Sequence, residues 1–228
     1  MGGWESAAGW WLEQIADDTI YDSDVVPLAG EVSVGRSGLW LDLGCGTGRI
    51  GEALEAEWIS CDVSEPLLAH VPAASRPVRS RLPNLSWLAP RSLSGALAVL
   101  VIEHLPDLDE LFRHVYRVVE PRGSLGVVMN HPAFTAEGSG PILDLDDDEV
   151  LWRWGRYFAP HVVEVPGSSG IVFHHRPLAD VLSVAARCGW VLERMVERGL
   201  STHAVQHHPG YVGQEHIPRL LGLRWRRG

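Results

Sequence analysis

The sequence predicts an α/β fold in which helices cover a mostly parallel β-sheet. Two short aliphatic runs, Ala96–Ile102 and Ser124–Met129, are typical of strands that are buried on both faces. Between them, Asp107–Val119 repeats apolar residues at helical spacing and is followed by Pro121. Strands that alternate with helices in this way indicate a parallel sheet.

The first third of the chain fits the same alternation. Glu5–Asp17 carries apolar residues at helical spacing, and a turn-rich stretch with Tyr21 and Pro27 follows. Leu39–Leu43 is a short apolar run closed by glycines, which predicts a buried strand that leads into a turn. We therefore expect a helix, an irregular connection and then the first strand.

A second unit comes directly after this turn. Arg49–Glu57 is predicted as a helix and Trp58–Cys61 as a short strand. The next helix is expected over about Pro66–Val71, with Ser64 as its N-cap, because a serine hydroxyl can accept a free backbone N–H and proline suits the first turn.

The regular pattern stops from His131 to about Phe173, where glycines, prolines and aromatic residues alternate. A long insertion at the carboxyl end of a strand is typical of substrate lids in α/β enzymes. After it, Arg176–Cys188 is predicted as a helix, and Trp190–Val196 and Thr202–Val205 as closing strands. Without a repeat or a linker, residues 1–228 are expected to form one domain, with 1–35 as an N-terminal helical cap and 131–175 as the lid.

Composition narrows the function classes. The chain has 228 residues, is 46% hydrophobic and carries a formal net charge of −10, whereas nucleic-acid-binding proteins normally show a basic stripe. The one dense basic run contains Arg219, Arg224, Arg226 and Arg227, and we interpret it as a solvated tail. All 19 basic residues are arginines, so no lysine is present to act as a base or to form a Schiff base.

The three cysteines are Cys45, Cys61 and Cys188. Their odd number and the absence of CxxC spacing argue for reduced thiols and against a disulfide framework or a zinc site. The N-terminal residues lack the basic region of a signal peptide, and no run of 18 apolar residues occurs. These features predict a cytoplasmic protein that does not bind membranes.

The most informative segment is Leu39-Trp40-Leu41-Asp42-Leu43-Gly44-Cys45-Gly46-Thr47-Gly48. An apolar strand ends at an acid and opens into three alternate glycines before a helix. Glycines permit positive φ angles and allow a ligand to lie against the backbone at the N-terminus of a helix. The segment therefore predicts a nucleotide-type binding loop.

Two nucleotide-binding families compete for this loop. A dinucleotide fingerprint counted from the strand would place its third glycine at position 49, which is Arg49. Its ribose-binding acid would lie about 20 residues on, whereas Asp62, directly after the second strand, is only 14 residues beyond Gly48. Instead, residues 42–48 resemble motif I of class I S-adenosylmethionine-dependent methyltransferases. Cys61-Asp62-Val63-Ser64 resembles the second acidic motif of that family.

The resemblance continues over residues 39 to about 130. Residues 101–108, Val-Ile-Glu-His-Leu-Pro-Asp-Leu, are similar to the exit of the family's fourth strand, and residues 117–123 resemble its RVLxPGG turn with Arg122 in place of a glycine. The resemblance implies a three-layer Rossmann-like sandwich. Its mostly parallel seven-stranded sheet would have an antiparallel closing strand.

The resemblance also implies which residues bind S-adenosylmethionine, with S-adenosylhomocysteine as the product. Gly44, Gly46 and Gly48 would pack along the methionine and ribose part, and Asp62 would accept both ribose hydroxyls. The other implied cofactor residues are Asp42, Cys45, Val63 beside the adenine and Val99 in the methionine pocket. Where the family often has acids, this chain has Ser94-Gly95 before the fourth strand and Ser80-Arg81 after the third.

Methyl transfer to oxygen benefits from a base, and histidine suits this role at neutral pH. His104 follows the fourth strand, and His131 follows the fifth, so these two are the candidate bases; the alternative for each is a histidine that orders a loop. Trp152, Trp154, Tyr157 and Phe158 suggest an aromatic acceptor pocket, although a helix face or core packing explains the same spacing.

An acid cluster, Asp144 and Asp146–Glu149, could hold Mg²⁺, but a solvated loop is the simpler interpretation, and no metal site is predicted. The expected function is methyl transfer to a small-molecule acceptor, at oxygen before nitrogen, by a monomer or homodimer. The alternatives are a non-catalytic S-adenosylmethionine-binding regulator and a nucleic-acid or protein methyltransferase. A nicotinamide-dependent dehydrogenase is disfavoured by the glycine register and the acid spacing.

Overall fold

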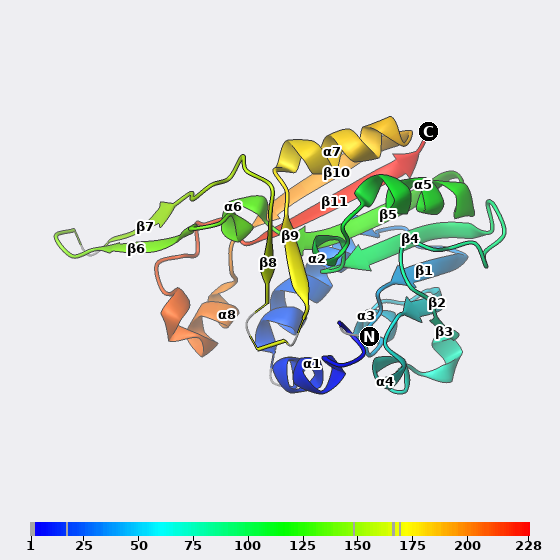
Figure 1. Cartoon of the computed structure of the whole chain (residues 1–228), viewed down its shortest axis with the longest axis horizontal. Coiled ribbons are helices and arrows are strands. Elements are labelled where there is room, and N and C mark those ends of the chain that lie inside the picture. The colour runs from blue at the N-terminus through cyan, green and yellow to red at the C-terminus, as the bar shows by residue number, and fades with distance from the viewer. Residues whose placement is uncertain (1–2, 17, 148, 166, 169) are drawn as a thin grey trace.

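The centre of the protein is a mixed β-sheet with the strand order β10-β11-β5-β4-β1-β2-β3 (Figure 1). The computed structural model describes residues 3–16, 18–147, 149–165, 167–168 and 170–228, and seven strands form the sheet within these residues. They are β1 (Leu39–Leu43), β2 (Glu57–Asp62), β3 (Pro77–Arg79), β4 (Leu93–Val99), β5 (Val119–Asn130), β10 (Trp190–Arg198) and β11 (Leu220–Arg227).

Strand directions confirm the predicted sheet. β1 pairs parallel with β2 and β4, β2 pairs parallel with β3, and β4 pairs parallel with β5. β11 runs antiparallel between β5 and β10. The sheet is therefore mostly parallel with an antiparallel closing strand, and the carboxyl ends of β1, β2, β4 and β5 meet at one edge.

Helices cover both faces of this sheet, as expected for a three-layer sandwich (Figure 1). The helical elements of the N-terminal half are α1 (Ala8–Ile15), the π-helix η1 (Tyr21–Val25), α2 (Val26–Val32), α3 (Arg49–Ala53), α4 (Glu65–Leu68), and the 3₁₀ turns η2 (Ala73–Ser75) and η3 (Ile102–His104). Those of the C-terminal half are α5 (Leu108–Val118), α6 (Pro132–Thr135), α7 (Leu178–Arg187), α8 (Thr202–His207) and η4 (Pro209–Tyr211).

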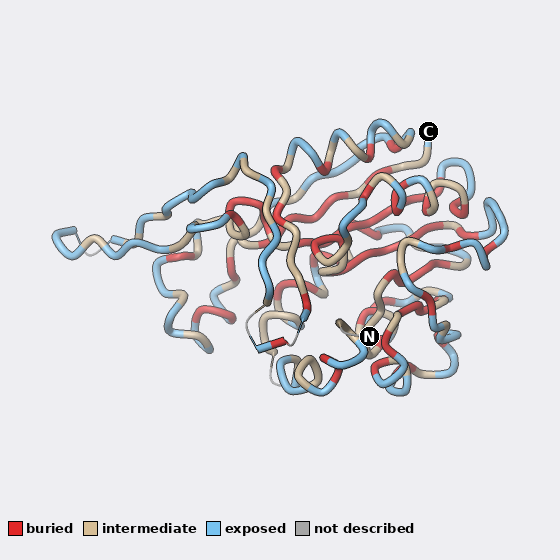
Figure 2. Tube along the Cα trace, viewed as in Figure 1, coloured by how far each residue is buried: buried red, intermediate tan, exposed pale blue. Residues whose placement is uncertain are grey.

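Alternating side chains of each strand separate two apolar cores. Leu41 and Leu43 of β1 point toward α5 and α7, whereas Trp40 points toward α2 and α3. Figure 2 shows that the central strands are largely buried, whereas the edge strands β10 and β3 are mostly exposed. Because both faces of the central strands are covered, their sequences are mainly apolar, which is why they could be recognised.

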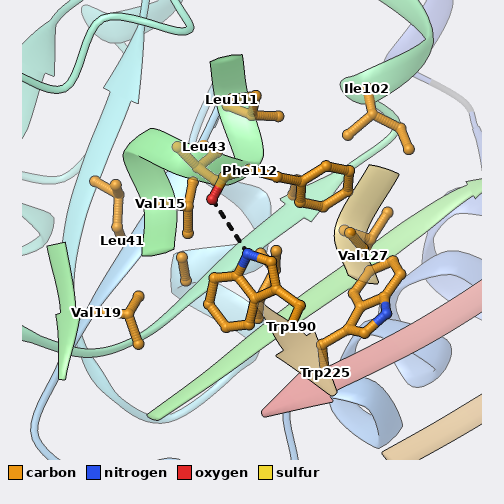
Figure 3. Close-up of a cluster of buried hydrophobic side chains, with 14 of the residues drawn as sticks. Leu41, Leu43, Ile102, Leu111, Phe112, Val115, Val119, Val127, Trp190 and Trp225 are labelled. Atoms are coloured by element: carbon orange, nitrogen blue, oxygen red, sulfur yellow. Dashed lines mark hydrogen bonds between the residues drawn. The ribbon is translucent and has the colours of Figure 1, made fainter. Parts of the chain in front are cut away.

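Three large aromatic residues lie in the core under α5 and α7 (Figure 3). The rings of Phe112 and Trp225 meet edge to face at 5.5 Å, and the Trp190 indole N–H donates to the Phe112 carbonyl at 3.1 Å. This bond satisfies the one polar atom of Trp190, so the side chain can be buried without an unpaired donor.

Several element predictions need adjustment. The helix expected over Arg49–Glu57 ends at Ala53, and the first helix is limited to Ala8–Ile15; Asp17 lies outside the described residues. Ser64 does precede α4, but its hydroxyl makes no cap hydrogen bond. The turn-rich stretch with Tyr21 and Pro27 was predicted wrongly, because η1 and α2 make it helical.

The C-terminal predictions were wrong in two places. Thr202–Val205 belongs to α8 and not to a strand. The basic run is not a solvated tail, because Leu220–Arg227 is β11, between β10 and β5. Arg224 and Arg226 both pair with Glu193 of β10, while the alternate residues Leu223 and Trp225 are buried. Apolar residues do alternate with a period of two in this segment, as in a strand. The arginines between them made it look like a solvated run of charges.

The segment 131–175 contains two β-hairpins after α6. One pairs β6 (Gly140–Asp144) with β7 (Glu149–Arg153) and extends away from the sheet (Figure 1). The other pairs β8 (His161–Glu164) with β9 (Val172–His175). The acid cluster lies at the first hairpin's turn; Asp148 is outside the described residues. None of the described helices has both the length and the apolar character that crossing a membrane requires.

Candidate active site

The loop after β1 is held by hydrogen bonds to the neighbouring strand. The backbone N–H groups of Gly44 and Cys45 both donate to the carbonyl oxygen of Cys61, at 2.8 and 3.0 Å. Gly44 has φ +67°, and a Cβ atom there would lie 2.7 Å from Cγ2 of Val101. Any larger residue would therefore push the loop away from the β4 exit, so the glycine is required by both its conformation and its space.

Asp62 connects this loop to the end of β2. Its Oδ2 accepts the Gly46 N–H at 3.0 Å, and its Oδ1 accepts the Ser64 N–H at 2.8 Å. Burial raises the pKa of Asp62, while these backbone donors act in the opposite direction. Because each carboxylate oxygen has a second lone pair, the fixed carboxylate can still accept two hydroxyl groups from a ligand.

Asp42, at the end of β1, lies directly behind the loop and is 1% exposed. Its Oδ2 has no hydrogen-bond partner among the described residues. Burial, assisted by the nearby Asp62, raises the pKa of Asp42 to about 7. An unpaired buried carboxylate is costly, which is why burial favours the protonated form of this group.

A cavity of about 340 Å³ opens at this edge of the sheet. Its walls come from the ends of β1, β2 and β4, from the segment after β3 and from the N-terminal helices. Six of the eight predicted cofactor residues line it: Gly44, Cys45, Gly46, Asp62, Val63 and Val99. The other two do not: Asp42 is buried behind the loop, and Gly48, with φ +86°, serves as the N-cap of α3.

The N-terminal segment contributes aromatic walls that the sequence analysis did not assign. Trp4, Trp11 and Tyr21 all line the cavity, and the rings of Trp4 and Trp11 meet edge to face at 5.5 Å. Tyr21 is fixed by the Arg49 guanidinium, which lies 4.4 Å from its ring centre. Tryptophans at positions 4, 10 and 11 were a visible signal, but helical periodicity alone explains them as core residues.

His104 lies on the same cavity, at the end of η3. Its Nδ1 is 2.8 Å from the carbonyl oxygen of Val172 in β9. Since a carbonyl can only accept, Nδ1 carries the proton, and in the neutral ring Nε2 has the lone pair. Burial lowers the pKa of His104, which favours this neutral form. The ring is held edge to face between Trp4 and Phe173.

His131 is placed differently from His104. It does not line the cavity, and it is 4% exposed. Its Nδ1 accepts the Ala133 N–H and caps α6, while its Nε2 is 2.8 Å from Oε1 of Glu197. Both ring nitrogens are therefore engaged in structural hydrogen bonds, and the neutral ring has no lone pair left for a substrate proton.

The four predicted acceptor-pocket aromatics lie in and after the β6–β7 hairpin, and the cavity lining contains none of them. Trp152 stacks on Phe134 and donates to the Ala133 carbonyl, and the Tyr157 hydroxyl accepts the Leu178 N–H. Trp154 and Phe158 are 58% and 86% exposed. Their placement gives the acceptor-pocket prediction no support.

The segment after β3 supplies the last wall, with Ser80, Arg81, Leu82 and Pro83 on the cavity. The Ser80 hydroxyl accepts the Trp87 indole N–H at 2.9 Å and donates to the Asn84 carbonyl. Its hydrogen-bonding capacity is thus largely used within the protein. Among the described residues, no group of three or more His, Cys, Asp or Glu side chains is arranged to hold a metal ion.

Comparisons with known proteins find similarity to methyltransferases. Residues 41–127 match the family model described as a methyltransferase domain. Over 112 residues the chain is 30% identical to the trans-aconitate 2-methyltransferase of Escherichia coli O1:K1 / APEC. This alignment covers 46% of the chain and 44% of that relative, so the chain matches less than half of the relative's length.

Solved structures extend the similarity to the whole fold. The S-adenosylmethionine-dependent methyltransferase of Mesorhizobium loti is 25% identical, with a TM-score of 0.77 over 90% of this chain and 99% of that one. The S-adenosylmethionine-dependent methyltransferase of Clostridium acetobutylicum, at 15% identity, has a TM-score of 0.60 over 97% of both chains. The second likeness concerns the fold alone.

Proposed function

Since the chain belongs to the class I S-adenosylmethionine-dependent methyltransferases, with S-adenosylmethionine as its cofactor, we propose that it methylates a hydroxyl oxygen of a small-molecule acceptor. The observation that carries this proposal is the position of His104. A histidine with a free lone pair lies on the same cavity as the glycine loop and Asp62.

The residues present fit this cofactor. Gly44 and Gly46 expose bare backbone to the cavity, Asp62 retains lone pairs for the ribose hydroxyls, and the unpaired Oδ2 of Asp42 lies behind the loop. Val63 and Val99 supply apolar walls for the adenine and the methionine part. When bound, the cofactor supplies an electrophilic methyl group on a sulfonium sulfur, which leaves as a neutral thioether.

His104 acts as the base in this proposal. Its Nε2 accepts the hydroxyl proton as the acceptor oxygen forms its bond to the methyl carbon. The hydrogen bond to the Val172 carbonyl fixes the tautomer and the ring orientation, and the packing of Trp4 and Phe173 restricts ring rotation. The sequence also predicts His131 as a candidate base. We propose instead that His131 positions α6 and takes no part in proton transfer.

A small-molecule acceptor is supported by two observations. The net charge of −10 opposes binding to phosphate backbones. A curated relative is named for the methylation of trans-aconitate.

We propose one domain over residues 1–228, with 1–35 as a cap and the β8–β9 part of 131–175 as a lid. The free cysteines support a reducing location such as the cytoplasm.

The test follows a labelled methyl group from S-adenosylmethionine into separate pools of hydroxylated small molecules including organic acids, of RNA and DNA, and of protein. The proposal expects label in a small-molecule pool, lost on His104→Asn and retained on His203→Asn, an exposed histidine of α8. Label that enters nucleic acid or protein only would overturn the acceptor class. Cofactor binding with no transfer to any pool would favour a regulatory S-adenosylmethionine-binding protein.

A further inference from the structure

A second depression adjoins the cofactor cavity on the outer side of His104. Its volume is about 540 Å³. Gly3–Ser6 forms one wall and Gly170–Val172, which leads into β9, forms the other. We propose that this depression binds the methyl acceptor and that Arg81 recognises a carboxylate or phosphate group on it. The inference rests on the proposed methyl transfer, since it names the acceptor's chemical class.

The two spaces meet at four shared residues. Trp4, Val63, Arg81 and His104 line both the cavity and the depression. An acceptor in the depression therefore lies next to the cofactor cavity at these side chains, one of which is the proposed base. For in-line transfer, the acceptor's hydroxyl oxygen must reach the methyl carbon directly at this junction, with His104 beside that oxygen.

Arg81 is the uncommitted positive charge at this junction. Arg49, also on the cavity, pairs with Asp22, and Arg79 pairs with Glu5 and Glu65. In the described part of the chain, no ion pair or side-chain hydrogen bond involves Arg81. Its guanidinium therefore has all its donors available, although the protein as a whole is strongly acidic.

The wall of the depression also contains an acid, Glu5, which contacts an arginine other than Arg81. Glu5 lines the depression, but its Oε1 is 2.5 Å from the Arg79 guanidinium, on a neighbouring residue of the β3 exit. Arg79 binds Glu5 and Glu65 together, so it holds the Glu5 carboxylate away from Arg81 and ties the N-terminal segment to the exit of β3. The depression therefore presents the Arg81 side chain beside the apolar residues Trp4, Ile171 and Val172.

This combination selects an organic anion. A guanidinium binds carboxylate and phosphate oxygens through paired N–H donors, whereas it gains little from a neutral amide and repels an amine. The apolar walls accept the carbon skeleton, and a hydroxyl elsewhere on the acceptor can reach His104. An acceptor with a single apolar body and no anion would leave the Arg81 donors unused.

The test measures binding to protein saturated with S-adenosylhomocysteine, by ligand-observed NMR. The probes are three matched sets on the same hydroxylated skeletons: carboxylates, their primary amides and the corresponding phosphate monoesters. The inference expects one anionic set to bind about tenfold or more tightly than the amides, the value of one charge-assisted interaction. The anionic set that binds more tightly identifies whether Arg81 recognises a carboxylate or a phosphate.

Variants then assign the preference to Arg81. Arg81→Gln should abolish the anion preference, Arg81→Lys should keep part of it, and Arg122→Gln, an exposed arginine before β5's apolar stretch, should leave it unchanged. Because Arg81 also lines the cofactor cavity, every variant is measured at saturating S-adenosylhomocysteine, whereas Arg122→Gln should bind S-adenosylhomocysteine as tightly as wild type. Wild-type protein without an anion preference, or a preference that survives Arg81→Gln, would overturn the inference. Protein that does not bind S-adenosylhomocysteine would instead show that the proposed function is wrong.

Discussion

The Nδ1 atom of His104 lies 2.8 Å from the carbonyl oxygen of Val172. This contact joins the exit of β4 to the β8–β9 hairpin, two segments that are 68 residues apart in the sequence. It fixes which nitrogen of His104 is protonated, and it leaves Nε2 as the only ring atom that can take a proton from the acceptor.

His104→Asn should therefore impair the chemical step and spare the cofactor. An asparagine amide can still donate to Val172, but it cannot accept a proton. We expect kcat to fall by about 10²–10⁴-fold, the usual contribution of a general base. In wild-type enzyme, kcat/KM should rise with pH to a plateau, with its midpoint below the ordinary histidine pKa because burial lowers the pKa of His104. Steady-state kinetics against pH checks both; a variant with unchanged kcat would remove His104 from the chemistry.

His131→Ala should act on stability and not on cofactor binding. The substitution leaves the Ala133 N–H without its cap and removes the contact with Glu197. We expect a loss of about 1–3 kcal/mol in unfolding free energy, measured by urea denaturation. Titration with S-adenosylhomocysteine serves as the control and should give the wild-type affinity. A large fall in kcat for correctly folded His131→Ala would restore the sequence-based prediction that His131 is the base.

Asp42 should make stability depend on pH. Because burial raises its pKa from 3.8 to about 7, the folded ligand-free protein holds this proton more tightly than the unfolded chain does between those values. The group's contribution to unfolding free energy therefore decreases as pH rises through this window. Asp42→Asn removes this titration. The unfolding free energy of the variant relative to wild type should therefore increase between pH 4.5 and pH 7.5, a span of about three units that includes most of this window.

Denaturant unfolding at the two pH values gives this comparison directly. Differences between the proteins cancel the titration of the histidines, which both share. A stability difference that does not change with pH would mean that Asp42 is ionised in the folded protein throughout.

The C-terminal strand should be essential for folding. Trp225 of β11 is 1% exposed and packs edge to face on Phe112 (Figure 3). Trp225→Ala should cost about 3–5 kcal/mol because it opens a cavity in the core. Arg226→Ala, the next residue, removes only a surface ion pair with Glu193 and should cost about 1 kcal/mol or less. Equal losses for the two variants in thermal and urea unfolding would contradict the placement of β11.

Local signals in the sequence were enough to predict the sheet and the cofactor half of the site. The apolar strand Leu39–Leu43, the glycines after it and Asp62 all act through near neighbours, so their chemistry is visible in short motifs. The elements wrongly predicted were those whose identity depends on distant partners. Leu220–Arg227 is a strand because β5 and β10 lie on either side of it, and two of its arginines, Arg224 and Arg226, pair with Glu193 of β10.

The acceptor half of the site was beyond local reasoning for the same reason. The rings of Trp4 and His104 are in contact although about a hundred residues separate them in the sequence. Only the folded chain brings the N-terminal segment, the β3 exit and β9 together. The aromatic cluster around Trp152 has the composition of a pocket, but tertiary packing against Phe134 makes it part of the insertion's own support. Composition could suggest that aromatic residues contact the acceptor. It could not choose between the N-terminal aromatic residues and the cluster around Trp152.

Asp62 offers the most direct test of the central claim, that the cavity at the carboxyl edge of the sheet binds S-adenosylmethionine. Isothermal titration with S-adenosylhomocysteine compares wild type, Asp62→Ala and Asp62→Asn with Asp109→Ala, an acid of α5 outside the cavity. Circular dichroism confirms that each variant is folded. The predicted result is a binding free energy that weakens by about 1–3 kcal/mol for Asp62→Ala, less for Asp62→Asn and not at all for Asp109→Ala. Wild-type protein that fails to bind, or a folded Asp62→Ala variant that binds as tightly as wild type, would contradict the assignment of this cavity to the cofactor.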